Sequence, residues 1–364
     1  MTRPVRVLVV EDSLTIRKRL VEVLAEDPEL EVVGEAADGR RGVELCERLR
    51  PDVVTLDMMM PVMTGLEAAE RIMAFCPTPI LVVSASTNRG ELFRTYDALA
   101  AGAIDVLDKP TGGEPAEGWE RQLRATVKLV SRIKVITHVR GRLAAAARGG
   151  VLDGPLAPVP GMLPPAQAWG ASAPPPRAVA IGGSTGSPGA IVEILRALPR
   201  DYPLPVLLVI HINEPFGKAF AEWLDAQSPV RVRYARDGEP LEGVRGATVR
   251  MAPPGWHLTL GRGALRLLEG PERHSCRPSV DVLFESLARE AGRETLACLL
   301  TGMGRDGAAG MLAVRRAGGR TIAQDEATSV VFGMPREAIL LGGAERVLGL
   351  PEIGPALAAA GRDR

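Results

Sequence analysis

The sequence predicts an α/β protein with two parallel sheets, each belonging to its own domain and covered by helices. Short apolar runs alternate with helical patterns over the first 107 residues, and similar apolar runs recur after residue 177. A stretch rich in Ala, Gly and Pro, from about residue 144 to 176, separates the two halves. Alternating strands and helices are typical of doubly wound parallel sheets, so both halves are expected to have this fold class.

The first half contains five predicted strands with helical patterns between and after them. The strands are expected at residues 5–10, 31–34, 52–56, 79–83 and 103–107. Amphipathic helices are expected at 15–25 and 40–49, and residues 119–143 are also helical in period. In the last of these, one stripe consists of Leu123, Val127, Val130 and Ile133. Five strand–helix units predict a parallel, doubly wound, flavodoxin-like domain over residues 1–122.

The middle of the chain is predicted to be a connection. A helical extension and a linker that contains LPPAQAWGASAPPP are expected over residues 123–177, because successive prolines continue neither a helix nor a central strand. The second domain is expected over 178–358. There RAVAIGGS, PVLLVIHIN and TLACLLTGM each read as a buried strand that runs into a polar loop. Such continuous apolar runs favour a mostly parallel sheet, with shorter β segments and hairpins between them.

The composition predicts a cytoplasmic protein without a nucleic-acid partner. The chain has 364 residues, of which 46% are hydrophobic, and Lys plus Arg and Asp plus Glu both number 44. This neutral balance argues against nucleic-acid binding, which usually needs a basic excess. The N-terminal residues lack the apolar core of a signal peptide, and no apolar run approaches the ~20 residues that span a bilayer. We expect a monomer that does not insert into membranes.

The cysteines give no sign of a metal site or of disulfides. Cys46, Cys76, Cys276 and Cys298 are scattered, and none belongs to a CxxC pair. Buried thiols in a reducing compartment are the expected state of all four.

Polar side chains follow the predicted strands of the first half, at the edge where parallel sheets bind ligands. Glu11 and Asp12 follow the first strand, Asp57 the third, Ser84 the fourth and Lys109 the fifth. Clustered carboxylates favour Mg²⁺, and a carboxylate can also accept a phosphoryl group. Lysine and a hydroxyl can then bind the phosphoryl oxygens. Helix capping by each carboxylate alone is the simpler alternative.

The first half contains four informative motifs: VLVVEDS, DVVTLDMMMPVMTGLE, VVSAS and GAIDVLDKP. They are similar to the receiver domain of two-component response regulators. The resemblance implies Asp57 as the phosphoacceptor and Mg²⁺ held by Glu11, Asp12, Asp57 and the backbone carbonyl of Met59. It implies that Ser84 and Lys109 bind the phosphoryl group, and that a histidine kinase is the phosphodonor. Val106 stands where such domains often have an aromatic residue.

The turn IGGSTGSP places Ser184 in a G-x-S-x-G pattern after a predicted strand. This pattern is typical of a nucleophile elbow, but a glycine-rich turn can also bind an anion or be a simple turn. The turn lacks the G-K-[ST] ending of a P-loop and the spacing of a dinucleotide-binding loop. Residue types alone leave these alternatives open.

A nucleophilic serine needs a base, and the base needs an orienting acid. Among the four histidines, only His211 ends a long apolar run, so it is expected at the same sheet edge as Ser184. His138, His257 and His274 are weaker candidates. Asp306 follows the strand in TLACLLTGMGRDG and is the predicted acid. The order Ser, His, Asp differs from that of α/β-hydrolases, which disfavours an ordinary esterase of that fold.

The second half contains five informative motifs: IGGSTGSPGA, VIHIN, RPSVDVLFESLA, LLTGMGRDGAAG and AQDEATSVVFGMPREAI. Together they resemble the catalytic domain of the chemotaxis methylesterase family CheB. The resemblance implies Ser184 as nucleophile, His211 as base, Asp306 as orienting acid and the Met303 N–H as an oxyanion donor. It implies hydrolysis of glutamate γ-methyl esters on methylated chemoreceptors, with methanol released and with deamidation of receptor glutamine as a related reaction. The esterase reaction is expected to need no cofactor, and phosphorylation of the receiver is expected to activate it.

Two other classes of function stay open at this point. One is an adaptor that is controlled by phosphorylation and catalyses nothing, and the other is a nucleotide-binding output domain. The complete Ser, His and Asp set argues against the first, and the missing P-loop lysine argues against the second.

Overall fold

The computed structural model describes residues 3–85, 89–109, 116–133, 135, 174–212, 216–217, 219–241 and 248–362. The chain divides into two compact units, Met1–Leu156 and Ala157–Arg364, and each is described by itself. None of the helices in these ranges combines the length and the apolar character that a membrane crossing requires.

The first unit contains a five-stranded parallel sheet, as predicted. Its strands are β1 (Val5–Val10), β2 (Leu30–Ala36), β3 (Val53–Leu56), β4 (Ile80–Ser84) and β5 (Asp105–Asp108). The spatial order is β2-β1-β3-β4-β5, and every pair is parallel. This is the flavodoxin-like order, in which the topological switch lies between β1 and β3. Each strand lies within two residues of its predicted bounds.

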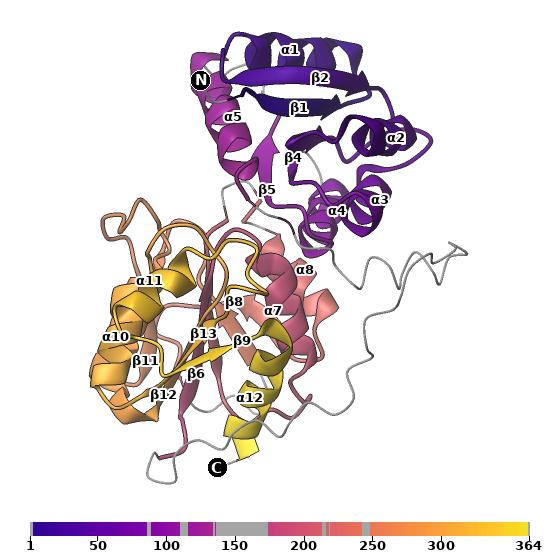
Figure 1. The fold of residues 1–364 in the computed structure, drawn as a ribbon. Coiled ribbons are helices and arrows are strands. Elements are labelled where there is room, and N and C mark those ends of the chain that lie inside the picture. The colour runs from indigo at the N-terminus through magenta and orange to yellow at the C-terminus, as the bar shows by residue number, and fades with distance from the viewer. Residues whose placement is uncertain are drawn as a thin grey trace. The chain divides into compact units, whose positions relative to one another are not determined.

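Helices cover both faces of this sheet (Figure 1). They are α1 (Leu14–Ala25), α2 (Gly39–Leu49), α3 (Gly65–Phe75), α4 (Arg89–Ala100) and α5 (Ala116–Val130). Helix α1 contacts α5 on one face, and α3 contacts both α2 and α4 on the other. Thr64 and Glu67 form a capping box that begins α3 directly after the Asp57 loop.

Helix α5 is shorter than the sequence predicts. The expected apolar stripe is confirmed, because Leu123, Val127 and Val130 are buried. The prediction of helix beyond Val130 is wrong for residues 131–133, which form a turn and a bend. There the Arg132 and Ile133 N–H groups bond three residues back, which tightens the last turn and ends the helix. Residues 136–143 lie outside the described residues. The predicted domain limit at residue 122 falls inside α5.

The second unit contains a seven-stranded parallel sheet and a separate antiparallel hairpin. The sheet order is β14-β13-β12-β6-β7-β9-β8. Its strands are β6 (Ala178–Gly183), β7 (Val206–Ile210), β8 (Arg231–Tyr234), β9 (Thr248–Met251), β12 (Thr295–Leu299), β13 (Arg320–Gln324) and β14 (Arg346–Leu348). The hairpin pairs β10 (His257–Gly261) with β11 (Ala264–Leu268). The predicted mostly parallel sheet with an added hairpin is therefore confirmed.

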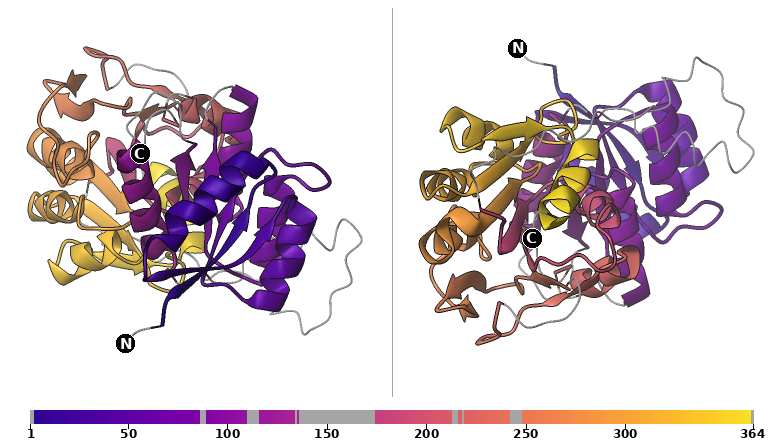
Figure 2. Two further views of the ribbon diagram at one scale, coloured as in Figure 1. Left: turned by 90° about the horizontal axis from the view of Figure 1, so that it is seen from above. Right: turned by 90° about the horizontal axis from the view of Figure 1, so that it is seen from below.

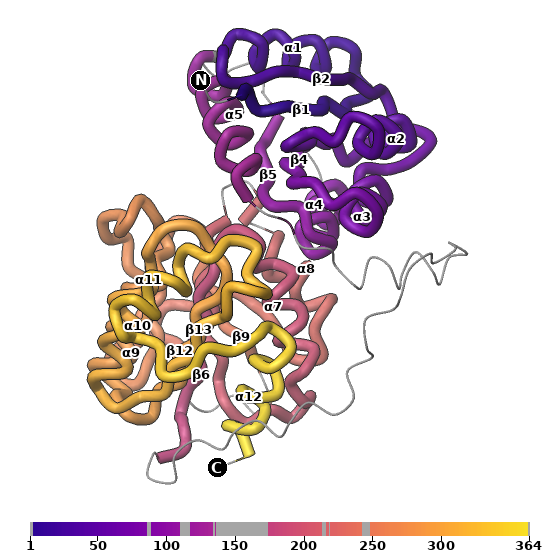
Figure 3. Tube along the Cα trace, in the orientation of Figure 1, coloured from indigo at the N-terminus to yellow at the C-terminus, as the bar shows by residue number. Residues whose placement is uncertain are grey.

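Two rows of helices enclose this second sheet, and Figures 2 and 3 show them from other directions and as a tube. One row consists of α12 (Leu350–Arg362), α7 (Ser187–Arg196) and α8 (Phe220–Gln227). The other consists of α9 (Val280–Glu290), α10 (Ala308–Arg316) and α11 (Met334–Leu340). The central strand β6 is buried along its whole length, between β12 and β7. The chain order reverses at β6, so its carboxyl end is where ligands are expected to bind.

Candidate active site and phosphoacceptor site

Ser184 and His211 directly follow the ends of two neighbouring parallel strands, β6 and β7. Gly183 at the end of β6 pairs with Ile210 at the end of β7, and each of the two side chains follows directly. The His211 N–H donates to the Gly183 carbonyl at 3.1 Å, which extends the ladder to the base of the loop. The structure thus brings these residues to one sheet edge, as the strand-end argument predicts.

The turn after β6 is held by backbone contacts that leave the Ser184 hydroxyl available. The Ser184 N–H donates to the Thr301 carbonyl at 3.1 Å. Its carbonyl accepts from the Ser187 N–H at 2.9 Å and from the Ser187 hydroxyl at 2.5 Å. Gly302 packs so closely that an added Cβ would lie 2.8 Å from the Ser184 Cβ. Among the described residues, nothing hydrogen-bonds the Ser184 hydroxyl.

Asp306 is buried and holds His211 by a short hydrogen bond. His211 Nε2 lies 2.8 Å from Asp306 Oδ2. The same carboxylate accepts from the Ser279 hydroxyl at 2.7 Å and from the Val280 and Asp281 N–H groups at 2.7 and 3.0 Å. Both of these N–H groups belong to the first turn of α9, where the helix favours negative charge.

Burial alone would raise the pKa of Asp306, but the hydrogen bonds from His211 and Ser279 outweigh burial and lower it. Asp306 is therefore ionised and fixed in position before any substrate binds.

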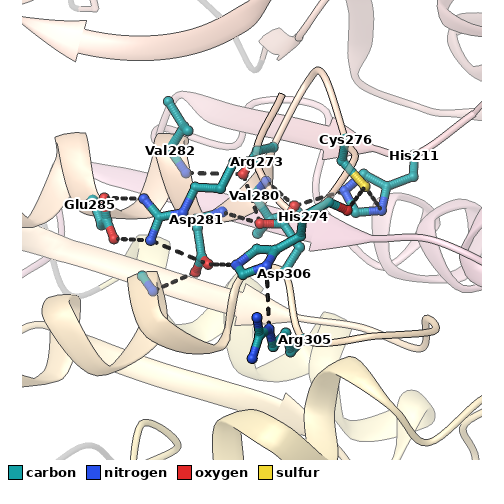
Figure 4. A network of polar contacts seen from close by, with 12 residues as sticks. His211, Arg273, His274, Cys276, Val280, Asp281, Val282, Glu285, Arg305 and Asp306 are labelled. Carbon is teal, nitrogen blue, oxygen red and sulfur yellow. Dashed lines mark hydrogen bonds and ion pairs between the residues drawn. The ribbon is translucent and has the colours of Figure 1, made fainter. Parts of the chain in front are cut away.

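The other imidazole nitrogen of His211 faces a cysteine that the sequence did not single out (Figure 4). His211 Nδ1 lies 3.5 Å from Cys276 Sγ, and this sulfur is also 3.4 Å from the His274 carbonyl. Burial would lower the pKa of His211, but Asp306 and Cys276 oppose it and raise the pKa to about 9. Cys276 lies 65 residues from His211 in the chain, so no spacing pattern predicts this contact.

The two other described histidines have structural partners. His257 is buried, with Nε2 2.9 Å from the Pro271 carbonyl and Nδ1 accepting from the Ser279 N–H at 3.1 Å. His257 therefore supports the residue that bonds Asp306, a role that sequence reasoning did not assign. His274 Nε2 lies 3.1 Å from Asp281 Oδ2, and Figure 4 draws this contact as a dashed line. His138 lies outside the described residues.

Met303 lies in the glycine-rich loop that follows β12 and touches the Ser184 turn. Gly302 of this loop accepts from the Gly333 and Met334 N–H groups, at 3.2 and 2.8 Å. The Met303 side chain is half exposed, and its own N–H donates to no acceptor within the described ranges. Because the preceding Gly302 packs against Ser184, a free backbone donor at Met303 has the character of an oxyanion donor.

In the first unit, three carboxylates and a lysine meet at the ends of β1, β3 and β5. Oxygens of Glu11, Asp12 and Asp57 lie within 4.8 Å of one another. Lys109 Nζ lies 2.7 Å from Asp57 Oδ1 and 3.0 Å from Glu11 Oε2. Burial, followed by the charge of Asp57, raises the pKa of Glu11 to about 7 despite Lys109. Burial also raises the pKa of Asp57.

These oxygens fit a hard divalent cation. Glu11 Oε2 and Asp57 Oδ1 are buried, and although Lys109 is close, neither accepts a well-aligned hydrogen bond. Carboxylate oxygens that lack hydrogen-bond donors are the ligands that Mg²⁺ prefers. The chemistry of the donor set therefore suits Mg²⁺.

Of the two remaining residues predicted for this site, Ser84 bonds a neighbouring helix, whereas the predicted role of Met59 concerns its backbone carbonyl and stays a prediction. The Ser84 hydroxyl donates to Glu91 Oε1 at 3.0 Å and lies 3.4 Å from the Thr95 hydroxyl, so in this state it bonds α4. The side chain of Met59 is exposed, and its sulfur lies 3.0 Å from an Arg94 nitrogen. Val106, in place of an aromatic residue, is buried.

Comparisons with known proteins match each of the two units to a protein family. A family model described as CheB methylesterase matches residues 179–357, and one described as response regulator receiver domain matches residues 7–116. A protein-glutamate methylesterase/protein-glutamine glutaminase of Anaeromyxobacter dehalogenans is 43% identical over 98% of this chain and 96% of its own. One from Myxococcus xanthus is 42% identical over 99% of this chain and 98% of its own. The chain therefore belongs to the CheB methylesterase family, whose members here carry a receiver domain before the methylesterase domain.

Proposed function

We propose that the chain is a protein-glutamate methylesterase that hydrolyses glutamate γ-methyl esters on chemoreceptors and is activated by phosphorylation of Asp57. The observation that carries the proposal is the bond between His211 and Asp306, at the end of the strand next to the one that ends at Ser184. An ordered base and a free serine hydroxyl at a topological switch point are the requirements of acyl transfer.

In the proposed mechanism, the Ser184 hydroxyl attacks the ester carbonyl of the methylated glutamate. His211 takes the hydroxyl proton on Nδ1, since Nε2 is bonded to Asp306. The buried carboxylate keeps the ring oriented and stabilises the imidazolium that forms. The Met303 N–H binds the developing oxyanion, and removal of one such donor typically costs about 3–4 kcal/mol of transition-state stabilisation.

The acyl-enzyme is then resolved by the same groups. His211 gives its proton to the departing methoxide, and methanol leaves. The neutral imidazole next removes a proton from water, which attacks the glutamyl ester and releases Ser184. The same steps would deamidate a receptor glutamine, with ammonia as the leaving group. We propose that neither reaction requires a metal or organic cofactor.

The receiver site is proposed to be the regulatory input. Asp57 accepts the phosphoryl group from a histidine kinase of the chemotaxis type. Glu11, Asp12, Asp57 and the Met59 carbonyl would hold Mg²⁺, which supplies positive charge against the phosphoryl oxygens. Lys109 and Ser84 bind the remaining oxygens, and for this Ser84 must release Glu91. We further propose a cytoplasmic monomer over the domains 1–122, 123–177 and 178–358, without nucleic-acid binding.

Methanol release from methylated receptor membranes tests the esterase. The native chain should release methanol, and Ser184→Ala should reduce the rate by about 10⁴ to 10⁶ while it keeps the native circular dichroism. Ser131→Ala is a matched control, since the hydroxyl of this serine belongs to the first unit and bonds the Lys128 carbonyl. Turnover that is equal in Ser184→Ala and the native chain would remove Ser184 from the mechanism, and no turnover in the native chain would favour an adaptor.

A further inference from the structure

Three groups with metal-ligand chemistry meet at the end of β7, although they come from distant parts of the chain. His211, Cys276 and Asp306 offer a nitrogen, a sulfur and a carboxylate oxygen within 4.8 Å of one another. Figure 4 shows the Cys276 sulfur directly beside the His211 ring. Cys276 is partly exposed, whereas the other three cysteines are buried. It is thus the cysteine that an ion from solvent can reach.

The separation of the nitrogen and the sulfur suits a tetrahedral ion. His211 Nδ1 and Cys276 Sγ are 3.5 Å apart. A tetrahedral Zn²⁺ with bonds of about 2.3 Å to sulfur and about 2.0–2.1 Å to nitrogen holds these two donor atoms about 3.5 Å apart. Without metal, the same separation is that of a weak thiol–imidazole hydrogen bond. The distance between the two donor atoms is therefore the one that chelation of the ion requires.

Asp306 completes this arrangement from the far side of the ring. Its four hydrogen bonds, to His211, Ser279, Val280 and Asp281, leave it poorly suited to bind a metal directly. Zinc-bound histidines, however, usually donate their second N–H to a carboxylate, which fixes the ring and raises the basicity of the ligand. The bond from His211 Nε2 to Asp306 is this kind of outer-shell support.

We propose that His211 Nδ1 and Cys276 Sγ form an inhibitory site for Zn²⁺, with Asp306 holding the imidazole from behind. Imidazole and thiolate are ligands that suit Zn²⁺, whereas Mg²⁺ prefers oxygen. Binding forms one Zn–N and one Zn–S bond and releases the thiol proton to solvent, so no electrons are transferred. Water fills the other positions of the ion.

The inhibitory effect rests on the proposed function, but the binding does not. In the proposed mechanism the Nδ1 lone pair receives the Ser184 proton. An ion bound to Nδ1 occupies that lone pair, so zinc would stop acylation without contacting Ser184. Phosphorylation of Asp57 would not relieve this block.

Calorimetric titration of the full-length chain with Zn²⁺ tests the site directly. Excess Mg²⁺ is present to occupy the receiver carboxylates. Cys276→Ser and Cys276→Ala should each weaken zinc binding by at least about tenfold, because loss of even an outer-shell partner costs about 10- to 100-fold. Ser184→Ala should bind Zn²⁺ like the native chain, and so should Cys298→Ala, which removes a buried thiol elsewhere.

A spectroscopic probe and an assay complete the test. Co²⁺ in place of Zn²⁺ should give thiolate-to-metal absorption in the native chain and in Ser184→Ala but not in Cys276→Ser. Zn²⁺ should inhibit methanol release reversibly, with a chelator restoring the rate. Inhibition of each variant is expressed as a fraction of that variant's own metal-free rate. On this scale, each Cys276 variant should need at least about tenfold more Zn²⁺ than the native chain for the same fractional inhibition.

The outcomes separate the site from the function. Equal zinc affinity in the native chain and both Cys276 variants would overturn the site, as would a Co²⁺ complex without thiolate absorption. Binding through Cys276 that leaves methanol release unaffected would overturn the inhibitory role. A chain that binds Zn²⁺ through Cys276 but releases no methanol under any condition contradicts the proposed function and leaves the metal site standing.

Discussion

Asp306 bonds His211 through Nε2 at 2.8 Å, so Nδ1 is the imidazole nitrogen left to act on a substrate. The orientation is set by the start of α9: the Ser279 hydroxyl and the Asp281 N–H donate to Asp306 Oδ1, and the Val280 N–H donates to Oδ2. The base, its orienting acid and the helix that fixes the acid thus form one connected unit.

Asp306→Asn should lower kcat by about 10⁴, because an amide in this place can present its NH₂ to His211 and favour the wrong tautomer. The fold should be retained, since Asn has the same shape as Asp. Methanol release and thermal unfolding, measured on the same preparation, check both statements. A rate within tenfold of the native one would mean that the carboxylate does not control the tautomer of His211.

His257→Gln should reduce the rate much less than His211→Gln. His257 acts through the Ser279 N–H and does not touch His211, so its loss loosens Asp306 without removing the base. Ser279→Ala should reproduce the His257→Gln effect, and the double variant should be little worse than either, because both changes break one chain of bonds. Additive effects would show that His257 and Ser279 support the site independently.

Cys276→Ala should move the acid limb of the pH–rate profile to lower pH. Burial lowers the pKa of His211, but Asp306 and Cys276 oppose burial and raise the pKa to about 9. Only the neutral imidazole can accept the Ser184 proton. Activity of the native chain should therefore rise with pH up to about 9. Without the Cys276 contribution the pKa of His211 falls, so the variant should gain relative activity near pH 7. A profile of kcat/KM in metal-free buffer gives both limbs, and an unshifted limb would contradict this role of Cys276.

The sequence predicted the parts of the site that follow from strand geometry. Ser184, His211 and Asp306 could be brought to one edge because each follows a buried apolar run, and parallel strands end at the same side of the sheet. Cys276 and Ser279 could not be found in this way. They lie in the connection between β11 and α9, where no periodicity relates a residue to the sheet.

The end of α5 shows a second limit of sequence reasoning. The apolar stripe continues to Ile133, but the chain leaves the α-helix after Val130. Local hydrogen bonds decide this point: the Ser131 hydroxyl donates to the Lys128 carbonyl, and the following N–H groups bond three residues back. The spacing of apolar residues gives no information on whether side-chain and three-residue hydrogen bonds replace the helical bonds of the backbone.

Mg²⁺ should stabilise the receiver unit more at pH 8 than at pH 5.5. The pKa of Glu11 in the folded chain is raised to about 7. The free energy of unfolding that protonated Glu11 contributes is therefore fully present below about pH 4.5 and is lost as the pH rises through about 7. Above pH 7, ionised Glu11 is buried beside Asp57, and a bound cation would offset their repulsion. At a concentration 100-fold above Kd, the gain in unfolding free energy is about 2.7 kcal/mol.

Thermal unfolding of the full chain with and without Mg²⁺ at the two pH values measures this effect. Asp57→Asn is the matched control, because it removes one of the two facing charges with little change in shape. Without Mg²⁺ this variant should be more stable than the native receiver at pH 8, and it should gain less from the ion. An equal Mg²⁺ effect at both pH values, or an undiminished one in Asp57→Asn, would mean that the ion binds away from these carboxylates.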